Sequence, residues 1–184
     1  MKKLLNILIL ILWFPAVGQQ TPASTQVKSI LIQNAFIHIG DGTTIANGAL
    51  GFENGIITYV GDGQDAPLFD LTVDAQGQQL YPGFIAANST LGLAEVDAVR
   101  ATRDDDELGD FLPHIRAAIA YDAESKIVES MRPNGVLMAQ ITPRGGLISG
   151  SSSVMQLDAW NWEDALIKTE DGIHLNWPNP YSRG

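Results

Sequence analysis

The sequence predicts an α/β protein that begins with a small all-β part. Over residues 28–80, short apolar segments alternate with turn residues, which is typical of closely spaced strands. Over residues 80–142, an apolar run is followed by a segment with apolar residues three or four positions apart, and then by a second apolar run. That order predicts a strand, a helix and a second strand parallel to the first, with a right-handed crossover.

Composition limits the class of protein. Of the 184 residues, 45% are hydrophobic, which is enough for a packed core and excludes a wholly disordered chain. The 21 acidic residues outnumber the 11 basic ones, so nucleic acid is not an expected partner, because the chain would repel phosphate. The sequence has no cysteine, which excludes disulfides, thiolate zinc sites and cysteine nucleophiles.

Residues 1–20 predict a secretory signal peptide. The basic start Met1–Lys3 is followed by the apolar run Leu4–Phe14 and by the small-residue region Pro15–Gly18. The alternative is a membrane anchor, but a run of about eleven residues is too short to cross a bilayer core about 30 Å thick. We therefore expect an exported protein, periplasmic or secreted, with no stable membrane span once the signal is removed.

The all-β part follows a polar tether at residues 21–27. Its strongest turn signal is Asn54-Gly55, because these residue types suit a two-residue hairpin turn in which both residues have positive φ. The expected strands are the segments 29–32, 35–39, 49–52 and 56–61, followed by short extended pieces at 73–75 and 79–80.

The second part begins with the apolar run 81–87, whose lack of alternation predicts a strand buried on both faces. Helical spacing of apolar residues extends over 114–132, and Asp122 is a candidate N-cap for its later half. Gly135 is expected in the left-handed conformation that ends the helix. Residues 136–142 then predict a second buried strand.

A glycine-rich loop is expected at 143–152, at the carboxyl end of that strand, where ligands bind in α/β folds. Its candidate binding residues are Arg144, Gly145, Gly146, Ser149 and Ser151. The loop lacks the lysine of a phosphate-binding P-loop and the spacing of a nucleophile elbow. The alternative is a tight turn that needs glycine only for its backbone. A short strand is expected at 154–157, and the tail from Trp160 shows no clear pattern.

The histidines and the acidic run 104–107 do not form a recognisable metal or catalytic motif. The three histidines, His38, His114 and His174, are far apart, and neither HxH nor HExxH occurs. His38 is expected to be an ordinary residue on a strand face. The acidic run 104–107, within the loop 100–110, is expected to be solvated, because Leu108 stands where a calcium ligand would be needed.

Three stretches together resemble the N-terminal part of the amidohydrolase superfamily, nearest its imidazolonepropionase-like branch. They are ILIQNAFIHIGDGTTIANGALGFENGIITYVG, VDAQGQQLYPGFIAANSTLGL and RPNGVLMAQITPRGGLISGSSSVMQLDAWNWEDA. The resemblance implies that residues 21–80 are the N-terminal part of a composite β-sandwich. It implies that residues 81–184 are the first βα units of a (β/α)8 barrel, which is incomplete here.

The resemblance also implies a chemistry, the hydrolysis of non-peptide C–N bonds in cyclic or linear amides. In this family one or two divalent metals such as zinc activate a water molecule. The first pair of metal ligands is an HxH motif that falls on Asn88 and Thr90, and the acidic residue before it falls on Ala86. Since neither residue offers an imidazole, no metal ligand and no catalytic residue is assigned in this chain.

Three functions remain open on this basis. The first is an amidohydrolase-like enzyme, present here as an N-terminal fragment, whose partner is a small-molecule substrate. The second, which Asn88 and Thr90 favour, is a non-catalytic, metal-free binding protein of the cell envelope with the same fold. The third is a secreted interaction module made of the β-rich residues 28–80.

The isolated 184-residue product is expected to be inactive, and poorly soluble or molten. The reason is that two or three barrel strands alone leave sheet edges unpaired and a core unfilled. Thermal unfolding followed by circular dichroism tests this expectation. A sharp, cooperative transition would contradict it.

Overall fold

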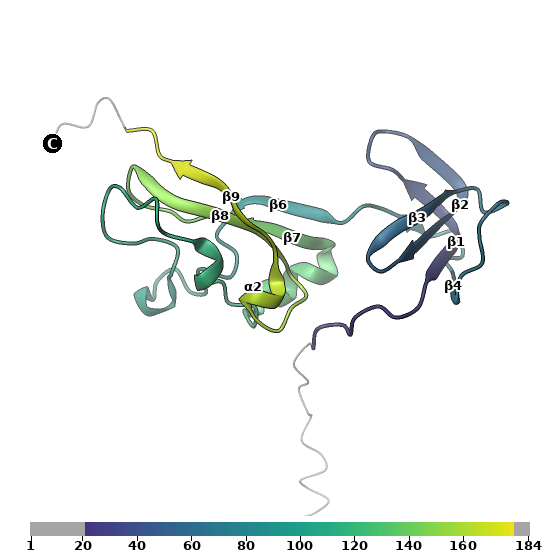
Figure 1. Ribbon diagram of the computed structural model, residues 1–184, viewed down its shortest axis with the longest axis horizontal. Coiled ribbons are helices and arrows are strands. Elements are labelled where there is room, and N and C mark those ends of the chain that lie inside the picture. Colours follow the sequence, from purple (N-terminus) through teal and green to yellow (C-terminus); the bar gives the residue numbers. More distant parts are fainter. Residues whose placement is uncertain (1–20, 179–184) are drawn as a thin grey trace, which may run out of the picture.

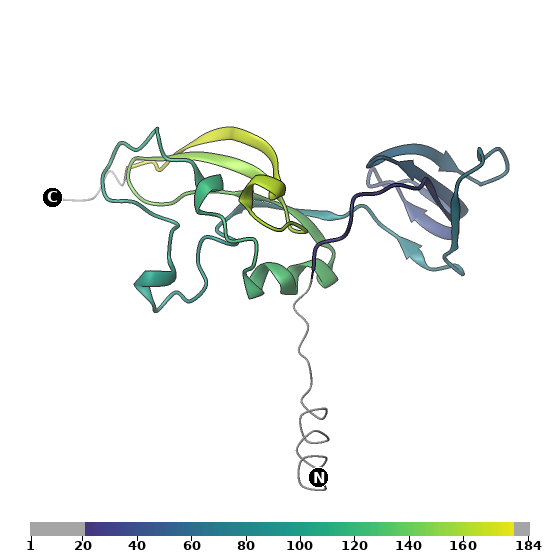
Figure 2. The ribbon, with the colours of Figure 1, turned by 60° about the horizontal axis from the view of Figure 1, so that its bottom comes forward.

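The computed structural model describes residues 21–178, so the expected signal peptide lies outside the described residues. It has a mixed α/β fold made mostly of strands, which form two sheets at opposite ends of an elongated molecule (Figure 1). The N-terminal segment runs between the two parts and contacts both (Figure 2). The Ala23 N–H donates to Asp158 Oδ2 at 3.2 Å, and the Gly55 N–H donates to Gln26 Oε1 at 3.0 Å.

The first sheet has the strand order β3-β2-β1-β4, with β5 also paired to β1. β1 and β2 are antiparallel, as are β2 and β3, whereas β4 and β5 run parallel to β1. The predicted hairpin is confirmed, since Asn54 and Gly55 have φ angles of 51° and 75° between β2 and β3. The strands are β1 (Ile30–His38), β2 (Thr44–Glu53), β3 (Ile56–Gly61), β4 (Leu71–Asp74) and β5 (Gln79–Leu80).

β1 replaces the two strands expected at 29–32 and 35–39. Asn34 has a φ of 56°, and the pairing with β2 shifts between Ile32 and Ala35. This bulge lets the strand continue through Gln33 and Asn34, the two residues that separate the expected segments.

The second sheet has the order β6-β7-β8-β9. β6 and β7 are parallel, which confirms the predicted parallel pair, whereas the later pairs are antiparallel. The strands are β6 (Phe84–Ser89), β7 (Val136–Ile141), β8 (Ile148–Gln156) and β9 (Leu166–Leu175). The tail that showed no clear pattern therefore contributes β9, together with α3 (Trp162–Ala165).

β6 is not buried on both faces, as its apolar run suggested. Phe84 and Ile85 are 65% and 58% exposed. The reason is topological, because β6 lies at the sheet edge and pairs only with β7. An unbroken apolar run shows that a strand contains few polar residues. It does not show whether that strand lies at the edge or in the middle of its sheet.

The glycine-rich loop expected at 143–152 is shorter than expected, because β8 already begins at Ile148. The expected strand at 154–157 is only the end of this longer one. Its serines are buried, and their hydroxyls donate to main-chain carbonyls: Ser149 Oγ to Gly145 at 2.6 Å and Ser151 Oγ to Ile115 at 3.1 Å. A serine-rich segment can therefore form a buried strand, because these bonds satisfy its hydroxyls.

The helical segment expected at 114–132 is broken into short pieces. Tyr121 is extended after the first piece, and the Asp122 N–H donates to Gly92 O at 2.8 Å. Asp122 is not the N-cap, because Ser125 Oγ accepts from the N–H groups at the start of α2. Gly135, with a φ of 86°, ends the segment in the left-handed conformation, as predicted. The helices between β6 and β7 are η1 (Arg100–Thr102), η2 (Ala117–Ala120), α2 (Lys126–Met131) and η3 (Arg132–Asn134).

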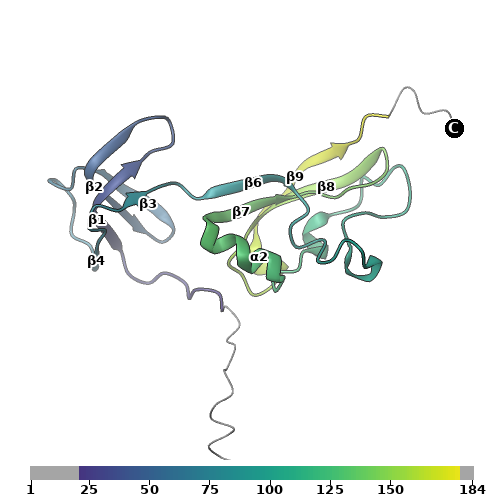
Figure 3. The same ribbon diagram turned by 180° about the vertical axis from the view of Figure 1, so that it is seen from behind.

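The main core lies between one face of the second sheet and the helices that cover it (Figure 3). Ala139 and Ile141 of β7 and Met155 of β8 are fully buried there. Val128 of α2 and Tyr121 pack in the same cluster. Within residues 21–178, no helix is both long enough and apolar enough to cross a membrane.

In the full-length product of the gene that encodes this chain, replacing Ile141 by alanine is expected to lower the free energy of unfolding by about 2–5 kcal/mol, because the change leaves a cavity in this core. Ile141→Val is the milder variant, with an expected loss of about 0.5–1.5 kcal/mol. Ile167→Ala is the matched control, since Ile167 is 56% exposed on β9. Pulse proteolysis in urea measures all three variants. Equal protease resistance of the Ile141 and Ile167 alanine variants would contradict this packing.

Candidate functional site

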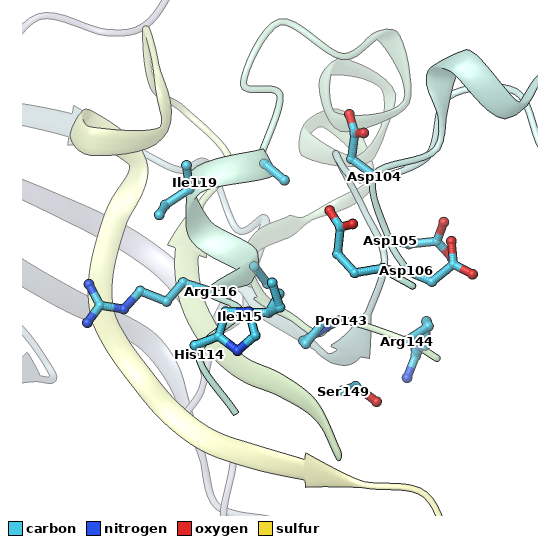
Figure 4. A pocket seen from close by; sticks show the side chains of 13 residues that line it. Asp104, Asp105, Asp106, His114, Ile115, Arg116, Ile119, Pro143, Arg144 and Ser149 are labelled. Carbon is cyan, nitrogen blue, oxygen red and sulfur yellow. The ribbon is translucent and has the colours of Figure 1, made fainter. Parts of the chain in front are cut away.

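A cavity of about 260 Å³ lies beside the turn that follows β7 (Figure 4). Its wall is formed by the acidic run 104–107, by residues that lead into η2 and lie within it, by the turn itself and by the start of β8. In Figure 4, Arg144 and Ser149 lie next to Pro143, with His114 on the far side of Pro143 from Arg144. The lining residues are Asp104, Asp105, Asp106, Glu107, His114, Ile115, Arg116, Ala117, Ile119, Ala120, Pro143, Arg144 and Ser149.

Of the five binding residues predicted from the sequence, Arg144 and Ser149 line this cavity, whereas Gly145, Gly146 and Ser151 do not. Gly146 has a backbone reason for being glycine. Its φ is 57°, and a Cβ atom there would lie 2.6 Å from the carbonyl oxygen of Gly109.

Arg144 is fixed on Asn88, which lies near the carboxyl end of β6. The guanidinium donates through Nη1 to Asn88 Oδ1 at 2.6 Å and through Nη2 to the Asn88 carbonyl at 2.7 Å. Asn88 has a φ of 51°, a left-handed conformation that asparagine tolerates better than most residues. Arg144, a predicted binding residue, is therefore in direct contact with Asn88, a replaced position of the HxH motif, although 56 positions separate them.

A polar network continues from Asn88 across the sheet. The Asn88 N–H donates to Gln140 Oε1 at 3.1 Å, and Gln140 Nε2 donates to Asp171 Oδ2 at 2.7 Å. Lys168 Nζ donates to Asp171 Oδ1, also at 2.7 Å. The pKa of Asp171 is lowered, first by Lys168 and then by Gln140, so this carboxyl group is held ionised. Side chains from β7 and β9 thus meet over one face of the sheet.

Sequence reasoning missed Gln140, Lys168 and Asp171. Gln140 left a signal, since it is the one polar residue in the apolar strand sequence VLMAQI. Asp171 left none, because it reaches the network through a bulge in β9, where Glu170 has a φ of 46°.

His174 of β9 lies near the same charges. Burial lowers its pKa below 6.5, the positive charge of Arg144 lowers it further, and Asp171 partly opposes both. Its Nε2 atom is buried and has no hydrogen-bond partner among the described residues. The neutral form of His174 is therefore favoured.

The other histidines do not join this group. His38 is on β1, as expected, where Nε2 lies 2.7 Å from Gln79 Oε1 and the ring stacks on Tyr81. His114 lines the cavity but is exposed.

The residues present do not fit the zinc site that the family resemblance implies. Within the described part of the chain, no three His, Cys, Asp or Glu residues lie close enough together to hold a metal. The two positions of the HxH motif carry Asn88 and Thr90, and the oxygen of the Asn88 side chain already accepts from a guanidinium. A divalent cation at Asn88 would face the positive charge of Arg144.

Comparisons with known proteins give one informative similarity. No known family profile and no curated protein matches the chain. Among solved structures, it is similar to an amidohydrolase from Thermotoga maritima, with a TM-score of 0.74 and 25% sequence identity over 82% of this chain. The chain spans 39% of that protein's length.

Two weaker similarities carry no functional argument. A prolidase complexed with N-methylphosphonate-L-proline has a TM-score of 0.43 and 16% identity, over 60% of this chain and 25% of its own. The A. niger ochratoxinase has a TM-score of 0.31 and 24% identity, over 40% of this chain and 17% of its own.

The similarity to the Thermotoga protein supports the resemblance to the amidohydrolase superfamily.

Replacing Arg144 by glutamine is expected to raise the pKa of His174, because the change removes a positive charge that disfavours the imidazolium. The histidine ring signals followed by NMR against pH measure the shift. Arg132→Gln is the control, since Arg132 is paired with Asp158 and does not act on His174. An unchanged pKa in Arg144→Gln would contradict the arrangement.

The same depressed pKa makes the stability pH-dependent. Below pH 6.5 the unfolded chain binds a proton at His174 more readily than the folded chain does. The contribution of His174 to stability is therefore lost as the pH falls below 6.5 and is constant above it.

Proposed function

We propose that the protein is an amidohydrolase-like hydrolase that acts on non-peptide C–N bonds in cyclic or linear amides. The observation that carries this proposal is the structural similarity to the Thermotoga maritima amidohydrolase. Because this chain spans 39% of that protein, the activity is proposed for the whole protein and not for the 184 residues alone.

The described residues would contribute the wall of a binding site. The cavity lies beside the turn at the carboxyl end of β7, which is parallel to β6, and ligands bind at such strand ends in α/β folds. Amide hydrolysis needs a base to activate water and a group that stabilises negative charge on the carbonyl oxygen. Neither role is assigned to a described residue, because the Arg144 guanidinium is held on Asn88 and the Nε2 atom of His174, which lies near it, is buried.

A second function is favoured by a specific observation. The contact between Arg144 and Asn88 places a guanidinium where the family resemblance implies a metal. The alternative is therefore an exported, metal-free protein of the cell envelope that has the same fold and binds a small ligand without hydrolysing it.

Activity of the full-length product of the gene that encodes this chain tests the two functions. We expect that product to hydrolyse simple amides such as hydantoin or N-acetyl-L-alanine, and the 184-residue chain to be inactive. Released amine or carboxylate is measured, together with bound zinc by elemental analysis. Removal of metal by a chelator, followed by addition of zinc, is the control for metal dependence. A product with neither metal nor turnover would discard the hydrolase and leave the binding protein.

A further inference from the structure

We propose that Arg144 forms the centre of a carboxylate-binding site at the carboxyl ends of β6 and β7. The ligand would be a small molecule with a free carboxylate that the guanidinium binds directly. If the proposed hydrolase function holds, on which this extension rests, the preferred substrates are amides that carry a free carboxylate. Binding itself does not depend on hydrolysis.

Among the described residues, no carboxylate forms an ion pair with Arg144. Within residues 21–178 there are five arginines, and four of them have a carboxylate within 4.0 Å. These pairs are Arg100–Asp106, Arg103–Asp105, Arg116–Glu170 and Arg132–Asp158. Arg144 has no such partner in this part of the chain, although the protein has 21 acidic residues. The lowered pKa of His174, to which the charge of Arg144 contributes, agrees with a positive charge that is still felt by its neighbours.

The guanidinium is also held in place by a neutral residue. Asn88 accepts two of its hydrogen bonds, through the side-chain oxygen and the main-chain carbonyl. A guanidinium has five N–H donors, so three remain for a ligand. The Arg144 N–H donates to Asp105 O at 2.6 Å, which fixes the backbone as well. A charge that is already positioned binds its partner with less loss of conformational entropy.

The surroundings leave Arg144 as the one cation of the cavity wall that is available to a ligand. Arg116, the other arginine of the wall, extends toward β9 (Figure 4) and pairs with Glu170 at 2.8 Å. Among the four acidic residues of the wall, Asp105 is buried and pairs with Arg103, and the half-buried Asp106 lies 4.0 Å from Arg100, whereas Asp104 and Glu107 are exposed. Solvent and salt weaken the influence of those exposed charges on a ligand.

A carboxylate fits this site better than a metal does. Guanidinium and carboxylate match in geometry and form paired, charge-assisted hydrogen bonds. A metal ion would instead have to compete with the guanidinium for Asn88 Oδ1. The cavity volume of about 260 Å³ lies just below the range of about 300–1,000 Å³ that is typical of small-molecule sites, which limits the ligand to a very small one.

Two probes that differ only in the carboxylate test the proposal. The full-length product is titrated with N-acetyl-L-alanine and with its neutral amide, N-acetyl-L-alaninamide, and binding is followed by NMR. We expect the acid to bind at least about tenfold more tightly than the amide, because a charge-assisted pair is lost with the amide. Equal affinities for the two probes would overturn the proposal.

Three variants test whether Arg144 is the residue that causes the preference for the acid. Arg144→Gln is expected to remove the preference for the acid, and Arg116→Gln, the matched control from the same cavity, to keep it. Asn88→Asp keeps Arg144 but supplies an internal carboxylate, so it is also expected to remove the preference. Circular dichroism checks that each variant is folded. A preference that survives in Arg144→Gln, or that is lost in Arg116→Gln, would overturn the assignment.

The failures of the two proposals are distinguishable. If the acid is preferred but no amide is hydrolysed, the hydrolase is discarded and the carboxylate site stands. If neutral amides are hydrolysed and no preference for the acid is found, the carboxylate site is discarded and the hydrolase stands.

Discussion

The burial of one face of β7 is the constraint on which the second half of the molecule depends. Ala139 and Ile141 face the core beneath α2, and both are fully buried. Since side chains alternate along a strand, Gln140 must point to the opposite face. There its amide bonds both Asn88 of β6 and Asp171 of β9, so the packing of two apolar residues determines where the polar network forms.

The polar network in turn brings the ends of neighbouring strands into a defined arrangement. Asn88 accepts hydrogen bonds from Arg144 and donates one to Gln140. The end of β6 is therefore bonded both to β7 and to the turn that follows β7. The left-handed backbone at Asn88 interrupts the regular pairing of β6 with β7. An asparagine suits this position because it tolerates the conformation and supplies a hydrogen-bond acceptor.

Electrostatics distinguishes this site from the one that the family resemblance implies. A metal site concentrates histidine and carboxylate ligands around a cation. Here the cation is part of the protein, and its partner is a neutral amide. A guanidinium is therefore held at the carboxyl ends of two parallel strands, and none of the described carboxylates is paired with it.

Local patterns in the sequence determined much of the fold. The Asn54-Gly55 hairpin, the end of the helical segment at Gly135 and the parallel pair around it follow from turn chemistry and apolar spacing, which act over a few residues. Arg144 and Asn88 were also identified in the sequence, but separately, one as a binding residue and one as a replaced ligand position.

Only the tertiary structure decided how these pieces meet. It showed that the apolar strand β6 lies at an edge, that the serine-rich β8 is buried, and that Ser125 rather than Asp122 caps α2. It also joined Arg144 to Asn88 across 56 residues of sequence. The physical reason is that burial and ion pairing depend on neighbours that are distant in the chain, whereas turns and caps depend on neighbours that are near.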